Sequence, residues 1–72
     1  MKAEIEIECK HPEIVKKSLE PDVEEAKKFD IRLKDEKNKL LLVIESNNIS
    51  GLLAGINSYM RLIRIAIEAS EV

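Results

Sequence analysis

The 72-residue sequence predicts a single α+β domain, residues 1–72, in the order strand, helix, strand, strand, helix. Two observations predict this class: apolar residues alternate in three short segments, and they recur at helical spacing in two others. A helical crossover leaves the first two strands parallel, so both pair with the third strand in an antiparallel sheet. The strand order is then 1-3-2, with both helices on one face.

The first strand covers residues 3–9. Its inward face carries four small or apolar residues: Ala3, Ile5, Ile7 and Cys9. Glu4, Glu6 and Glu8 form the opposite face, which we interpret as a solvated or salt-bridged surface rather than a cation site. Cys9 has no partner cysteine in the chain, so we expect a buried and inert thiol.

A short amphipathic helix follows the first strand. His11-Pro12-Glu13 is typical of a helix start, because proline is tolerated in the first turn and an early acid complements the helix dipole. The core-facing pattern is formed by Ile14, Val15, Ser18 and Leu19. Pro21 is predicted to bound this helix, and residues 22–27 to form a linker or a weak helical turn.

A hairpin comes next. Phe29, Ile31 and Leu33 alternate with polar residues in the second strand, and residues 35–38 form a polar turn. The third strand, residues 39–45, is predicted to point Leu40, Leu42 and Ile44 inward. Leu41 and Val43 then face away from the core, which indicates either a central strand or a sheet face covered by a second chain.

The last third of the chain, residues 50–72, predicts one long helix with an N-cap from Ser46-Asn47-Asn48. One broad stripe at helical spacing is apolar and is expected to cover the sheet. Its members are Ile49, Leu52, Leu53, Ile56, Met60, Ile63 and Ile67. Tyr59 is placed at the edge of this stripe.

A second row runs along nearly the opposite side of the same helix. It comprises Gly51, Gly55, Ser58, Leu62 and Ile65, and continues to Ala69. Each glycine costs roughly 1 kcal/mol against alanine inside a helix, so close approach of another helix is a sufficient reason for two of them. For the glycines that helix belongs either to this chain or to a partner; for Leu62 and Ile65 we favour a partner. These five residues are the candidate partner interface.

Composition excludes several classes of function. The net charge of -2 gives no global basic field for nucleic acid, and one histidine cannot build a His-based metal cluster. We therefore expect no enzyme activity, no metal and no cofactor. Residues 1–4 lack the apolar core of an export signal, and no run approaches 18 apolar residues, so we expect a cytoplasmic protein with no membrane contact. Abundant Lys and Glu without Gln, Thr or Trp is typical of thermophile proteins.

The solvent-facing strip of the long helix holds Ser50, Asn57, Arg61, Arg64 and Glu68. Arg61 and Arg64 stand three residues apart, so both can meet one phosphate or carboxylate. A solvated helix edge is the simpler interpretation of this pair.

The run Asn57-Ser58-Tyr59-Met60-Arg61, in a C-terminal helix after strand-helix-strand-strand, resembles the small dimerising subunit of the KEOPS complex in its archaeal type. That family typically has a leucine-arginine step and then N-S-[YF]-L-R. Ser18-Leu19-Glu20-Pro21-Asp22 is similar to the family's turn after its first helix. The leucine-arginine step falls on Leu52-Leu53, so the arginine is absent. The chain is then either the main subunit or a divergent paralogue.

The resemblance implies a non-catalytic subunit of the machinery that places threonylcarbamoyl on the adenosine beside the tRNA anticodon. It implies a homodimer whose halves each carry one sugar-kinase-like catalytic subunit, with tRNA bound only as part of the complex. On this resemblance Arg61 and Arg64 are the candidate tRNA contacts. The alternative is a stand-alone RNA-binding domain of KH-like shape. That alternative predicts a G-x-x-G loop between helices, and the sequence lacks one.

Overall fold

The computed structural model describes residues 1–25 and 30–71, and for residues 22–25 the backbone alone. The elements follow the predicted order: β1 (Lys2–Glu8), α1 (Pro12–Glu25), β2 (Asp30–Glu36), β3 (Lys39–Glu45) and α2 (Ile49–Ser70). The α+β class is therefore confirmed. None of the helices in the described ranges is long and apolar enough to cross a membrane.

The sheet is antiparallel and has the predicted order β1-β3-β2. Leu40, Leu42 and Ile44 of β3 lie on its covered face with exposed fractions of 0%. Leu41 and Val43 point to the open face and are half-buried. Because β3 has a strand on each side, the central-strand explanation of its continuous apolar run is confirmed.

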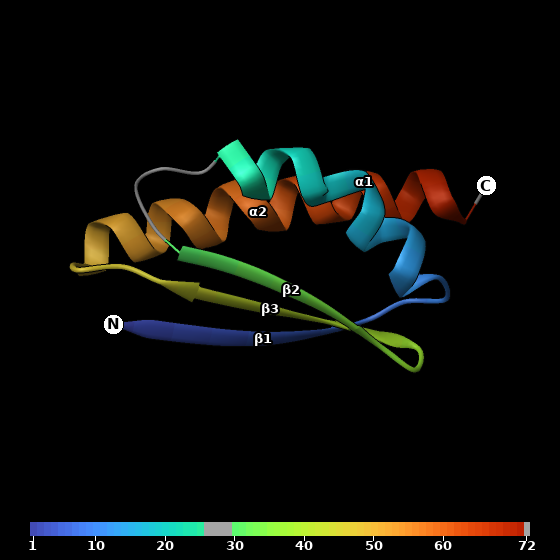
Figure 1. Cartoon of the computed structure of the whole chain (residues 1–72), viewed down its shortest axis with the longest axis horizontal. Coiled ribbons are helices and arrows are strands. Elements are labelled where there is room, and N and C mark those ends of the chain that lie inside the picture. The colour runs from blue at the N-terminus through green and yellow to red at the C-terminus, as the bar shows by residue number, and fades with distance from the viewer. Residues whose placement is uncertain (26–29, 72) are drawn as a thin grey trace.

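Both helices cover the same face of the sheet, as predicted (Figure 1). α1 packs over β2 and alongside α2. The buried core between the two layers is formed by Cys9, Val15, Leu19, Leu40, Leu42, Ile44, Leu52, Tyr59 and Ile63. Cys9 is thus buried where the sequence placed it.

The prediction that Pro21 bounds the first helix is wrong, because α1 continues through it to Glu25. The stretch interpreted as a turn, residues 18–22, is therefore helical. Of residues 22–27, expected to form a linker or a weak helical turn, residues 22–25 are helical. Proline removes one backbone donor, which leaves the carbonyl four residues earlier unpaired. Pro21 is exposed, so water can satisfy that carbonyl and the helix can proceed. The predicted inward position of Phe29 lies outside the described residues.

α2 begins and ends close to the predicted limits, but its buried face is rotated from the predicted stripe. Tyr59, expected at the edge, is 5% exposed and lies at the centre of the buried face with Leu52 and Ile63. Ile49 and Leu53, expected in the core, are 52% and 51% exposed. The predicted stripe is wider than the share of a three-stranded sheet that remains beside α1. One flank of the stripe therefore lies beyond the sheet.

Candidate protein-binding surfaces

α2 carries a different surface on each of its flanks. One flank faces α1 and holds the row that we call the glycine row: Gly51, Gly55, Ser58, Leu62 and Ile65. The other flank faces β1 and holds a groove. Before the start of α2, Ser46 N donates a hydrogen bond to Met1 O, which precedes β1. After the end of α2, the carboxylate of Glu71 raises the pKa of Cys9, which follows β1. α2 therefore runs along β1 in the same direction from end to end, as Figure 1 shows.

The structure divides the glycine row. Gly55 is buried and Leu62 packs partly buried against the core, whereas Ser58 and Ile65 remain on the surface. Ile65 is 57% exposed. At the glycine end the contact within the chain is therefore substantial, and Ile65 is the apolar member most available to a partner.

Gly51 has a local explanation that sequence reasoning missed. A Cβ added to Gly51 would lie 2.5 Å from Ser46 Oγ and 3.3 Å from Asn48 Oδ1. The capping segment before α2 thus lies against Gly51, and an added side chain would require Ser46 Oγ to rotate away. This local crowding favours glycine at residue 51 without requiring a neighbouring helix.

Ile14 adds a second exposed aliphatic side chain to the outer surface of the helical layer. It is 47% exposed in the first turn of α1, although the sequence pattern placed it with Val15 and Leu19 in the core. Glu13 and Glu71 both act on the Cys9 thiol, so the start of α1 lies near the end of α2. Ile14 therefore lies toward the same end of the molecule as Ile65. Adjacent helix positions lie about 100° apart, so Ile14 points away from the core centre that Val15 faces.

On the other flank, a groove of about 560 Å³ lies between α2 and β1, and we call it the β1 groove. Its lining is aliphatic with a charged rim: Ile7, Met60, Ile63 and Ile67, with Arg61, Arg64 and Glu68. The sequence analysis assigned no groove here, because Ile7 and the helix are far apart in the chain. An open apolar groove beside an edge strand is a surface suited to another protein segment.

Arg61 and Arg64, the candidate tRNA contacts, are brought together at the rim of the β1 groove. Both side chains are exposed. Arg64 Nε lies 3.5 Å from Glu68 Oε1, so part of its charge is balanced within the helix. Their contact with tRNA stays a prediction.

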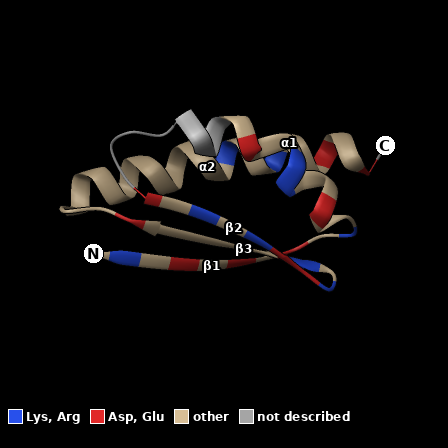
Figure 2. Cartoon of the chain, viewed as in Figure 1, with Lys and Arg blue, Asp and Glu red and all other residues tan. Residues whose placement is uncertain are grey.

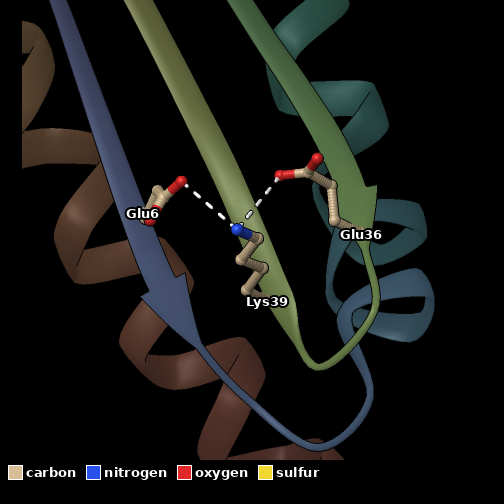
Figure 3. A network of polar contacts seen from close by, with 3 residues as sticks. All are labelled: Glu6, Glu36 and Lys39. Carbon is tan, nitrogen blue, oxygen red and sulfur yellow. Dashed lines mark hydrogen bonds and ion pairs between the residues drawn. The ribbon is translucent and has the colours of Figure 1, made fainter.

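The open face of the sheet carries ion pairs along the glutamate row of β1. Lys39 Nζ lies 3.4 Å from Glu6 Oε1 and 4.0 Å from Glu36 Oε1 (Figure 3). Lys2 Nζ lies 3.3 Å from Glu4 Oε1. The interpretation of this row as a salt-bridged surface is confirmed for Glu4 and Glu6. Within residues 1–25 and 30–71, no three His, Cys, Asp or Glu side chains gather as metal ligands.

Cys9 has the properties of a structural thiol. Burial raises the pKa of the Cys9 thiol above its ordinary value of 9.0, and the carboxylates of Glu71 and Glu13 raise it further. Because the thiolate is the reactive form, the neutral thiol is a poor nucleophile near pH 7.

Comparison with known proteins finds a family that covers nearly the whole chain. A family model described as "Transcription factor Pcc1" matches residues 1–71. No curated protein matches the sequence. The match covers every described element from β1 to the end of α2. The chain therefore belongs to the Pcc1 family, the family of a KEOPS subunit.

Proposed function

We propose that the chain is a non-catalytic subunit of the KEOPS complex, and that it serves as a homodimerisation module that binds the catalytic subunit. The complex would place threonylcarbamoyl on the adenosine beside the tRNA anticodon, with the chemistry on a sugar-kinase-like partner. Membership of the Pcc1 family supports a role in tRNA modification. Dimerisation, the catalytic partner and a cytoplasmic location are parts of the proposal.

One observation carries the proposal: α2 leaves large aliphatic side chains exposed on both flanks. Ile65 is exposed on the α1 side, and Ile49 and Leu53 are exposed on the β1 side. An 8.2 kDa chain has little surface to spare for such residues. Apolar patches of this kind are typical of protein–protein interfaces. Two flanks give room for two partners at once.

The catalytic subunit is assigned to the α1 side, where the glycine row meets Ile14. Ser58 and Ile65 lie at the surface there, and the small side chain of Ser58 permits close approach of another helix. The other members of the glycine row are less exposed and lie below this surface: Gly51, Gly55 and Leu62. The side chains of Lys17 and Glu20 on α1 are exposed and provide a polar rim.

Co-expression with a sugar-kinase-like KEOPS catalytic subunit tests the proposal directly. The expected complex contains two copies of each chain, measured by light scattering after affinity purification of the catalytic subunit. Ile65→Asp should abolish co-purification, because a charge would be buried in the interface without a partner. Leu62→Asp is a poor probe, since Leu62 also packs against the core.

Leu53→Asp is the matched control: it places the same charge on the same helix at a similar exposure, but on the other flank. It should still co-purify, in a one-to-one complex. Co-purification of Ile65→Asp at wild-type levels would contradict the assigned surface. Tight, salt-sensitive tRNA binding by the isolated chain would instead favour the stand-alone RNA-binding alternative.

A further inference from the structure

We propose that the free edge of β2 binds an extended segment of another protein, with alternating acidic and aliphatic residues, as an added antiparallel strand. This surface lies outside both flanks of α2, so the proposal goes beyond the proposed function. In the described structure β2 is an end strand of the sheet. Its pairing with β3 is continuous from Asp30 to Glu36, and it contains no proline. An uninterrupted edge strand of this kind offers its outer backbone groups to a further strand.

The hydrogen-bonding parity of the sheet decides which backbone groups of β2 face outward. Met1 and Ser46 exchange two backbone hydrogen bonds, of 2.8 Å and 2.9 Å, at the end of the β1–β3 ladder. The even-numbered residues of β3 therefore point their N–H and C=O groups at β1, and the odd-numbered residues point theirs at β2. The latter pair with the even-numbered residues of β2. The free edge of β2 thus presents the backbone groups of Ile31, Leu33 and Asp35.

The open face of β2 carries two basic side chains at its centre. Arg32 and Lys34 are exposed, and Figure 2 shows blue segments in the middle of β2 between its acidic ends. Within the described part of the chain, neither side chain forms an ion pair, whereas Lys2 and Lys39 on the same face each lie within 4.0 Å of a glutamate. Two unpaired cations at alternate positions of an edge favour a partner strand with acidic residues at the same spacing.

An antiparallel partner would bring its side chains closest at these two positions. Because the odd-numbered residues of β2 form the hydrogen-bonded pairs of the new ladder, the positions opposite Arg32 and Lys34 are non-hydrogen-bonded pairs. In such pairs the Cα atoms lie roughly 4.5 Å apart, closer than in the hydrogen-bonded pairs. Acidic residues there neutralise both cations, and a basic residue at each end of the segment meets Asp30 or Glu36.

The covered face of β2 sets the other half of the pattern. Ile31 and Leu33 are half-buried and pack against the core from the end strand. α1 lies over β2, so the helical layer reaches this side of the sheet (Figure 1). Aliphatic residues opposite Ile31 and Leu33 extend the apolar layer and remove its outer flank from water. Asp35, which shares this face, already has Lys16 Nζ at 3.3 Å.

The charge pattern also separates the two edges of the sheet. The open face of β1 carries Glu4, Glu6 and Glu8, so the same acidic segment would meet like charges there. β1 of another copy has the required alternation of acidic and aliphatic residues. However, pairing β2 with it uses two different edges and leaves one of each unpaired, so it produces an open array. A segment of a different protein satisfies the β2 edge without propagating such an array.

The test uses the intact chain and a fluorescently labelled peptide, Lys-Thr-Glu-Ile-Glu-Ile-Lys, with binding measured by fluorescence anisotropy. Arg32→Glu and Lys34→Glu should each weaken peptide binding by about tenfold, because each replaces an attraction across the strands by a repulsion. Lys37→Glu makes the same charge change at the exposed turn of the hairpin and should leave the affinity unchanged. A peptide with both glutamates replaced by glutamine should bind wild type about tenfold more weakly. Circular dichroism of every variant confirms folding.

Backbone methylation of the peptide reads the pairing independently. The amides of its two isoleucines point at β2, so N-methylation of both should abolish measurable binding. The amides of its two glutamates point away, so N-methylation there should be tolerated.

Four outcomes would overturn the proposal. They are no binding of the peptide to wild type, equal loss from both methylated peptides, unchanged affinity in Arg32→Glu and Lys34→Glu, and growing assemblies of the wild type that pair β2 with β1. A labelled RNA strand that binds in place of the peptide, and is lost in Arg32→Glu, would assign the two cations to nucleic acid and also overturn it. None of these results bears on co-purification with the catalytic subunit, so the two proposals fail separately.

Discussion

The backbone amide of Gly51 donates a hydrogen bond of 2.7 Å to Asn48 Oδ1, and this bond fixes the start of α2. Asn48 has extended backbone angles, as an N-cap residue requires. The carbonyl of Asn48 also accepts the amide of Leu52 at 3.1 Å. One side chain thus satisfies a backbone amide in the first turn of α2.

Removing this cap should destabilise the fold. Asn48→Ala is expected to lower the free energy of unfolding by about 1 kcal/mol, because the amide of Gly51 loses its side-chain acceptor. Urea unfolding monitored by circular dichroism measures the change. Asn48→Asp keeps an acceptor oxygen and should stay close to wild type. Equal losses in the two variants would show that the cap bond is not the cause.

Ser46 and Gly51 should be energetically coupled. Gly51→Ala gains helix propensity, at most about 1 kcal/mol in this first turn, but its Cβ meets Ser46 Oγ. Ser46→Ala removes that oxygen, so Gly51→Ala should be more favourable in the Ser46→Ala background than in the wild type. A double-mutant cycle of unfolding free energies measures the coupling. Strict additivity of the two substitutions would contradict the steric explanation.

Lys39 should contribute little to stability despite its two carboxylate partners. Its side chain is 39% exposed and that of Glu6 is 63% exposed, so water screens both pairs. Lys39→Ala is expected to lower the unfolding free energy by less than about 1 kcal/mol, with a smaller effect at 1 M salt. Lys37→Ala, at the exposed turn of the hairpin, is the control. A loss that does not change with salt would point to packing of the lysine stem instead.

The Cys9 thiol should react slowly, and its ionisation should lower the free energy of unfolding at alkaline pH. Its pKa is raised in the folded state, so the folded chain retains the proton longer than the unfolded chain. The contribution of this pKa difference to the free energy of unfolding is complete below the unfolded pKa. It is lost as pH rises from about 9 through the folded pKa. Alkylation by iodoacetamide at pH 8 should be much faster in urea than in buffer. Cys9→Ala should remove that part of the alkaline decline in unfolding free energy.

Arg61 and Arg64 should affect tRNA binding only within the assembled complex. Arg61→Gln and Arg64→Gln are each expected to weaken tRNA binding and reduce its logarithmic salt slope by roughly one, because each removes one phosphate contact. Filter binding from 50 to 300 mM salt measures the slope. Lys37→Gln, an exposed position at the hairpin turn outside the proposed surfaces, is the control. Unchanged slopes would leave the two arginines as a solvated helix edge.

Much of the fold follows from local patterns in the sequence. The three strands, the order 1-3-2 and the inward set Leu40, Leu42 and Ile44 are all as expected, because side-chain alternation and the crossover rule act locally or through topology. The cap at Asn48 also follows, since capping depends on a few adjacent residues. Pro21 shows the limit of such rules: an exposed proline costs α1 one hydrogen bond but does not end it.

The sequence by itself determined that the chain has more apolar helix surface than its core can cover, because composition and helical spacing require it. Only the tertiary structure decided which residues are left over. Leu62 and Gly55 turn toward the chain's own core, whereas Ile65 and Leu53 remain outside. The rotation of a helix depends on how it shares a sheet with its neighbour. The rotation of α2 therefore results from its packing against α1 and the three strands together, and no single sequence segment predicts it.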